Sequence, residues 1–175
     1  HEIIGQLWLA NFSEKSNKPI TNVVFMGMGE PLLNFDNVIE ATKIIKDQNA
    51  YGLSRKRITI STSGIVPNIK ELNKHVDVSL AISLHAANDD LRDKIVPINK
   101  KYPIKMLLSS CIDFLADHDS KRHITIEYIL IKDINDSYED AKSLVSLLST
   151  FPCKINLIPF NKFEGSDYEL SLIHI

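Results

Sequence analysis

The sequence predicts an α/β fold with a parallel sheet, either a partial (β/α) TIM-type barrel or an open sheet. Short apolar runs rich in Val and Ile alternate along the chain with amphipathic helical patterns, which is typical of right-handed βαβ crossovers. Five such runs occur in 175 residues, whereas a closed eight-stranded barrel takes about 250 residues. A partial barrel or an open parallel sheet therefore fits the sequence better than a closed barrel.

The expected elements follow one another in a regular order, and a helix precedes each strand. The expected helices cover residues 2–12, a segment capped by Asn34 or Asp36, 67–72, 103–117, and 136–149 with a cap at Asn135 or Asp136. The expected strands cover residues 21–26, 57–62, 76–84, 122–131 and 154–159. The run at 76–84 shows little alternation, which is typical of a strand buried on both faces of a parallel sheet.

The composition is that of a globular domain with no strong charge bias. At 44% hydrophobic and 24% charged residues, the chain is long enough to form one sizeable core. The formal net charge of −2 lacks the basic excess of many nucleic-acid-binding domains. Three small basic clusters could contact phosphates, but we favour solvated loop charge for them: Arg55-Lys56-Arg57, Lys100-Lys101 and Lys121-Arg122.

The sequence indicates neither a membrane segment nor a metal site. No apolar run approaches the ~18 residues that suggest a transmembrane helix, and the N-terminus does not resemble a signal peptide, so we expect a cytoplasmic protein with no membrane partner. Cys111 and Cys153 lie far apart, without a CxxC, a CxxxCxxC or a Cys/His group at ligand spacing. We expect both to be packed thiols and expect no metal ligand in this chain.

Distinctive polar residues follow the first predicted strand, which runs into Gly27-Met-Gly-Glu-Pro31. Glycines allow a close approach of the backbone, and the Glu30 carboxylate can accept charge-assisted hydrogen bonds. The loop therefore suits a ligand with a cationic amine. A plain strand-to-helix turn with a solvated Glu stays open as the alternative.

Three further predicted strands also end in polar residues, namely Ser61-Thr-Ser-Gly64, Ser83-Leu-His-Ala86 and Ile158-Pro-Phe-Asn161. Because the carboxyl ends of parallel strands form the ligand-binding edge of such folds, we expect these groups to converge with Glu30 on one site. Each group also has a structural explanation. The serines can satisfy loop backbone groups, His85 can be a hydrogen-bonded buried histidine, and Asn161 can be a turn residue.

Four strings in the chain closely resemble one family: GMGEPLLN, RITISTSG, AISLHAANDDLRDKIVPINKKY and PCKINLIPFN. They are similar to the radical S-adenosylmethionine (SAM) enzymes that methylate C2 of adenine in 23S rRNA, many of which also act on tRNA. The resemblance extends from Glu2 to about Asn161. It implies an RNA-processing methyltransferase of the cytoplasm, with S-adenosyl-L-methionine and a [4Fe-4S] cluster as cofactors. It also implies 23S rRNA and tRNA as partners, and an electron donor that reduces the cluster.

The resemblance further implies how the cofactor is bound. Glu30 would bind the methionyl amine, and Asn161 would hold the nucleoside end. In this family the cluster cleaves SAM to a 5′-deoxyadenosyl radical, a cysteine carries the methyl group to adenine C2, and a second cysteine resolves the adduct. The implied cofactor-binding residues are Gly29, Glu30, Ser61, Ser83, Leu84, His85 and Asn161.

The chain departs from the family pattern at both ends. The CxxxCxxC motif, the resolving cysteine and the general base belong upstream of His1, and the methyl-carrying cysteine belongs downstream of Ile175. We therefore expect residues 1–175 to be the central part of a radical SAM core domain, with no catalytic residue, no cluster and no turnover. Residues from about 165 to 175 leave the pattern, and we expect a truncation junction or a reading-frame artefact there.

Two other functions stay open. A different radical SAM enzyme would share the fold, and its upstream cysteine spacing and its product would distinguish it. A non-catalytic barrel could instead bind a nucleoside, or a partner protein through its exposed sheet edge. The sequence leaves open the oligomeric state, the residues that contact RNA, and whether rRNA alone or both RNA classes are substrates.

Overall fold

The computed structural model describes residues 1–12, 18–116 and 122–172. Three parts of the expected organisation lie outside these ranges. They are the end of the helix expected at 103–117, Lys121 of the third basic cluster, and the last three residues of the expected artefactual tail.

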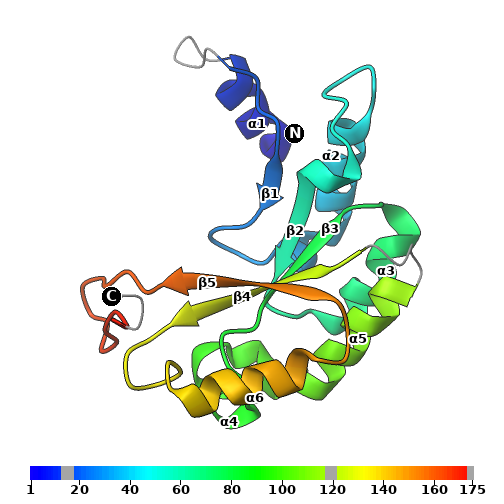
Figure 1. Ribbon diagram of the computed structural model, residues 1–175. Coiled ribbons are helices and arrows are strands. Elements are labelled where there is room, and N and C mark those ends of the chain that lie inside the picture. The colour runs from blue at the N-terminus through cyan, green and yellow to red at the C-terminus, as the bar shows by residue number, and fades with distance from the viewer. Residues whose placement is uncertain (13–17, 117–121, 173–175) are drawn as a thin grey trace.

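Five parallel strands form one curved sheet in the order β1-β2-β3-β4-β5 (Figure 1). The strands are β1 (Val23–Phe25), β2 (Ile58–Thr62), β3 (Ser79–Ser83), β4 (Ile124–Leu130) and β5 (Cys153–Pro159). Each strand pairs in parallel with the next strand along the chain. This sequential order is that of a (β/α) barrel rather than a doubly wound sheet, so the expected partial barrel is confirmed.

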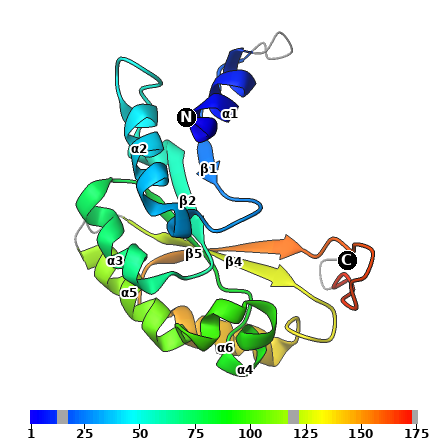
Figure 2. The same cartoon turned by 180° about the vertical axis from the view of Figure 1, so that it is seen from behind.

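The helices connect the strands and cover one face of the sheet. They are α1 (Glu2–Phe12), α2 (Phe35–Lys46), α3 (Val66–His75), α4 (Asp89–Ile95), α5 (Ile104–Ala116) and α6 (Tyr138–Leu148). Figures 1 and 2 show α2, α3, α5 and α6 along the outer side of the sheet, while the concave side is open. No helix within the described ranges is both long enough and apolar enough to cross a membrane.

The core lies between the sheet and the outer helices, and β4 shows how the sequence directs it there. Four alternate residues of β4 belong to the buried hydrophobic cluster: Ile124, Ile126, Tyr128 and Leu130. Successive strand residues point to opposite faces, so Thr125, Glu127 and Ile129 face the concave side. Burial of each large apolar side chain contributes about 1.5–3 kcal/mol. The apolar residues therefore fix the register that presents the polar residues of β4 on the open face.

Some expected boundaries are wrong, and side-chain contacts explain them. Helix α3 continues to His75 rather than ending near residue 72, because Asn73 Nδ2 donates to the Phe114 carbonyl of α5 at 2.8 Å. Strand β3 begins at Ser79 rather than 76. The Asp77 carbonyl accepts a bond from Lys46 Nζ at 2.6 Å, so this carbonyl bonds to a side chain rather than to a neighbouring strand.

Helix α4 was not expected, and the expected cap of α6 is wrong. Asn88 caps α4 by accepting from the Leu91 N–H at 2.9 Å. The N-cap of α6 is Ser137, which forms a capping box with Asp140, rather than Asn135 or Asp136. Asn34 occupies the N-cap position of α2, one of the two expected there, although its side chain makes no cap bond. The amide of Asn135 instead donates to two carbonyls at the sheet edge.

Candidate functional site

The loop after β1 turns at two glycines and ends in a well-held carboxylate. Gly27 and Gly29 have φ angles of 118° and 107°, which side chains with a Cβ rarely adopt. Glu30 Oε1 accepts from the Leu32 N–H at 3.0 Å. Glu30 Oε2 accepts from both the N–H and the hydroxyl of Ser63 at 2.7 Å. The carboxylate therefore joins this loop to the end of β2, and Oε1 keeps one lone pair for a further donor.

A buried carboxylate that the sequence reading missed lies between the strand ends. Glu127 of β4 is 5% exposed, and its Oε2 accepts from the hydroxyls of Ser61 at 3.0 Å and Ser83 at 3.3 Å. Ser83 and Glu127 are register partners in neighbouring strands. A signal was available in the sequence, because Glu127 interrupts an apolar strand at a position that alternates with its core residues.

The His85 side chain links the segment just beyond β3 to the backbone of β4. Its φ of 60° is left-handed, which is uncommon outside glycine. Its Nδ1 accepts from the Ile129 N–H at 3.1 Å, so in the neutral ring the proton lies on Nε2. Burial, helped by the charge of Arg92, lowers the pKa of His85 to about 4. At neutral pH this site therefore offers an uncharged N–H donor.

Arg92 of α4 is fully buried and donates hydrogen bonds to backbone carbonyls at the ends of β2 and β3. It donates to the carbonyls of Ser63 at 2.6 Å, Ser83 at 3.1 Å and Leu84 at 3.1 Å. A fourth bond goes to Asn99 Oδ1 at 2.9 Å. Burial lowers the pKa of Arg92 to about 10, which still leaves it charged at pH 7. Sequence reading missed this residue because it lies in a polar run of ordinary appearance.

The structure brings most of the predicted ligand residues to one edge of the sheet. Glu127 joins Ser61 to Ser83, Glu30 lies beside Ser63, and His85 follows two residues after Ser83. Their assignment as cofactor ligands stays a prediction.

Two predicted residues differ from the rest. The Leu84 side chain is fully buried in the hydrophobic core, so only its backbone can take part. Asn161 is exposed and lies two residues beyond β5. Among the described residues it has no hydrogen bond to the other predicted ligand residues.

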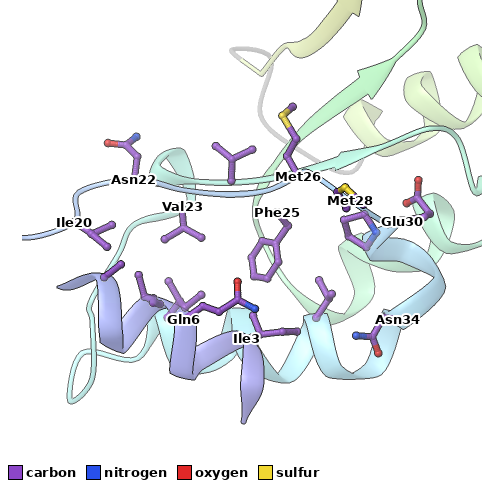
Figure 3. A pocket seen from close by; sticks show the side chains of 17 residues that line it. Ile3, Gln6, Ile20, Asn22, Val23, Phe25, Met26, Met28, Glu30 and Asn34 are labelled. Atoms are coloured by element: carbon purple, nitrogen blue, oxygen red, sulfur yellow. The ribbon is translucent and has the colours of Figure 1, made fainter. Parts of the chain in front are cut away.

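A separate cavity of about 510 Å³ lies beneath β1 (Figure 3). Ile3 of α1 and Phe25 of β1 point into it, and Glu30 and Asn34 lie at one end. Of the predicted ligand residues, Gly29 and Glu30 line this cavity. The other predicted residues lie at the strand ends, so we place the candidate site there and regard the cavity as its neighbour.

The described residues do not fit an iron–sulfur cluster. Cys111 is fully buried in α5, and burial raises its pKa to about 12. Cys153 is half-buried at the start of β5, and burial raises the pKa of its thiol as well. Throughout residues 1–12, 18–116 and 122–172, no three His, Cys, Asp or Glu side chains are grouped to hold a metal ion.

Residues 10–145 match the family model described as "Radical SAM superfamily". The sequence is 61% identical over 173 residues to proteins named "Dual-specificity RNA methyltransferase RlmN" from Pseudomonas putida and Pseudomonas entomophila. These alignments cover 96% of this chain but 45% and 46% of the relatives. The chain thus spans about half the length of the curated relatives it matches.

Two solved structures share the fold. A radical SAM methyltransferase from Sphaerobacter thermophilus superposes with a TM-score of 0.87 at 37% identity, covering 94% of this chain and 48% of that chain. A domain of pyruvate-formate lyase-activating enzyme from Bacteroides vulgatus superposes with a TM-score of 0.61 over 86% of this chain and 84% of that one. The latter is 20% identical, so it supports the fold alone.

Proposed function

Because the chain belongs to the radical SAM superfamily, we propose that the protein containing it methylates C2 of adenine in 23S rRNA and tRNA. The observation that carries this proposal is the 61% identity to proteins named as dual-specificity RNA methyltransferases. The proposed reaction takes place in the cytoplasm, and an electron donor supports it. Adenine C2 is not nucleophilic, so ordinary polar methyl transfer would fail there.

The donor set at the strand ends fits S-adenosylmethionine. When bound, SAM supplies the methyl group and the means to start radical chemistry at an unactivated aromatic carbon. We propose that the free lone pair of Glu30 accepts a bond from the methionyl ammonium, beside the open backbone of Gly29. Charge-assisted bonds of this kind are roughly twice as strong as neutral ones.

The remaining residues orient the cofactor in this proposal. The hydroxyls of Ser61 and Ser83 each donate a hydrogen bond to Glu127, so their oxygen lone pairs are left to accept from the ligand. The Nε2–H of His85 is an uncharged donor, and the Leu84 backbone fixes the position of its neighbours. Asn161, on the loop after β5, would reach the nucleoside end.

The iron–sulfur cluster does not fit the described residues, so its ligands belong to other parts of the protein in this proposal. None of the residues described above is assigned a catalytic role. We accordingly propose that residues 1–175 alone bind the cofactor weakly and do not turn over.

Titration calorimetry with SAM tests the site assignment. We expect Glu30→Gln and Asn161→Ala each to weaken binding, because each removes a proposed contact. Glu40→Gln is a matched control, since Glu40 is an exposed carboxylate of α2 that pairs with Lys43. Equal SAM affinity in all four proteins would show that the cofactor binds elsewhere.

A further inference from the structure

A basic cleft lies at the opposite end of the strands from the candidate cofactor site. It has a volume of about 470 Å³ and opens where β2, β3, β4 and β5 begin. Its cationic lining comes from segments that are far apart in the sequence: Arg55 and Lys56 before β2, Arg122 and His123 before β4, and Lys154 in β5. The fold therefore gathers charges that look unrelated along the chain.

The positive charge of the cleft is only partly neutralised. Asp77 pairs with Arg122 and lies 4.0 Å from Arg55, and no Asp or Glu of the described residues lines the cavity itself. Four permanent cations thus face one carboxylate at the rim. Lys56 and Lys154 are exposed, and neither makes an ion pair within the described part of the chain. Such an excess is notable in a chain whose formal net charge is −2.

The cations of the cleft contribute to lowered pKa values of two neighbouring groups, Lys46 and His123. Burial, then the charges of Arg122 and Arg55, lower the pKa of Lys46, whose Nζ bonds to the Asp77 carbonyl. Burial and the charge of Lys154 lower the pKa of His123. Mutual repulsion among cations is relieved when an anion enters between them.

The Arg122 side chain has spare donor capacity. It is 10% exposed, and its guanidinium donates to Asp77 and, at 3.5 Å, to the Val78 carbonyl. Its Nε–H is buried and has no acceptor among the described residues. An unsatisfied buried donor of this kind is costly, and phosphate oxygens are acceptors that a guanidinium binds well.

We propose that this cleft binds a phosphate group, held by Arg122, Lys56 and Lys154. The phosphate has two possible sources, an RNA backbone or a small phosphate-containing molecule. The RNA source rests on the proposed function, whereas phosphate binding does not. The cleft is distinct from the candidate cofactor site. Arg122 of the cleft and Glu127 of the cofactor site are separated by five residues of extended chain, about 17 Å.

The test compares the protein with its Lys56→Ala/Lys154→Ala variant in two binding measurements. The first is the affinity for a fluorescein-labelled ribosomal RNA hairpin, titrated at several salt concentrations. The second is the thermal midpoint in sodium phosphate against sodium chloride of equal ionic strength. The control variant is Lys70→Ala/Lys142→Ala, which removes the same charge from exposed positions on α3 and α6.

If RNA is the source, the cleft variant should bind the hairpin about five- to tenfold more weakly near 0.1 M salt, and its salt slope should be shallower by about 1.5. Phosphate stabilises folded proteins in general because it is excluded from their surface. If a small phosphate is the source, phosphate should therefore raise the thermal midpoint of the unsubstituted protein and of the control variant more than that of the cleft variant. Either result supports the site. The proposal is overturned if the cleft variant matches the control variant in both measurements.

Two further measurements distinguish a failure of this proposal from a failure of the proposed function. Lys56→Arg/Lys154→Arg keeps the charge and should keep the affinity. SAM affinity should be unchanged in the cleft variants, because the lysines lie outside the strand-end site. If the protein without substitutions did not bind SAM, the proposed function would be refuted, but the phosphate measurement would remain valid.

Discussion

Replacement of Arg92 by Met should destabilise the protein by about 3–5 kcal/mol. The guanidinium donates four hydrogen bonds that reach two strand ends and Asn99. Hydrogen bonds of charged donors contribute about 1.5–3 kcal/mol each, but the cost of removing the cation from water offsets much of their sum. Methionine has a similar volume but removes the donor from all four acceptors, and among the described residues only the Leu84 carbonyl is known to keep another bond, from the Ala86 N–H at 2.8 Å. The loss of these buried bonds is the costly part of the change.

The assay is urea unfolding at pH 7, followed by far-ultraviolet circular dichroism. Arg92→Lys should fall between the parent and Arg92→Met, because one ammonium cannot span acceptors on β2, β3 and Asn99 together. Arg57→Met is the matched control. Arg57 is exposed and donates to the Thr21 carbonyl, so we expect a loss below about 1 kcal/mol. A loss for Arg92→Met as small as that of the control would refute the role assigned to Arg92.

Three other predictions follow from individual contacts. His85 has a folded-state pKa near 4 against about 6.5 unfolded, so the unfolded state binds more protons and stability should fall by roughly 2–3 kcal/mol as pH drops from 6.5 to 4. In His85→Asn, whose side chain tolerates a positive φ, urea unfolding across this pH range should lack that loss, and an unchanged loss would contradict the prediction. Ser137→Ala should cost about 1 kcal/mol in urea unfolding, because it removes the cap bond to the Asp140 N–H, and a neutral effect would show that the capping box is dispensable. Cys111, with its pKa raised to about 12, should resist iodoacetamide at pH 8 until urea unfolds the protein, whereas rapid labelling of native protein would show that α5 opens.

The alternation of strands and helices could be predicted because each strand carries its own apolar run. The apolar runs predict the five-stranded parallel sheet, and the sheet in turn predicts that polar residues at the strand ends lie at one edge. Helix α4 could not be found in this way, because its buried side chain is Arg92 rather than an apolar residue. Hydrophobic periodicity detects helices that bury apolar faces, and α4 is stabilised by hydrogen bonds instead.

The candidate site was only partly predictable, because its hydrogen bonds join residues of different strands. Glu30 stands out after two glycines, but its partner Ser63 and the link from Ser61 to Glu127 depend on register between strands. A sequence shows that Glu127 lies in a strand, yet it does not show which hydroxyls lie opposite. The basic cleft shows the same limit, because the sequence does not reveal that Arg55 and Lys56 lie near Arg122 in the fold.

The central claim is that the strand-end residues serve radical SAM methylation of RNA, and nucleoside mass spectrometry tests it most directly. The protein containing this chain would be purified without oxygen and incubated with SAM, a reductant and 23S rRNA or tRNA. We predict 2-methyladenosine in the digested RNA, and its loss in Glu30→Gln but not in Glu40→Gln. Methylation at another atom, no methylation at all, or full activity in Glu30→Gln would contradict the account.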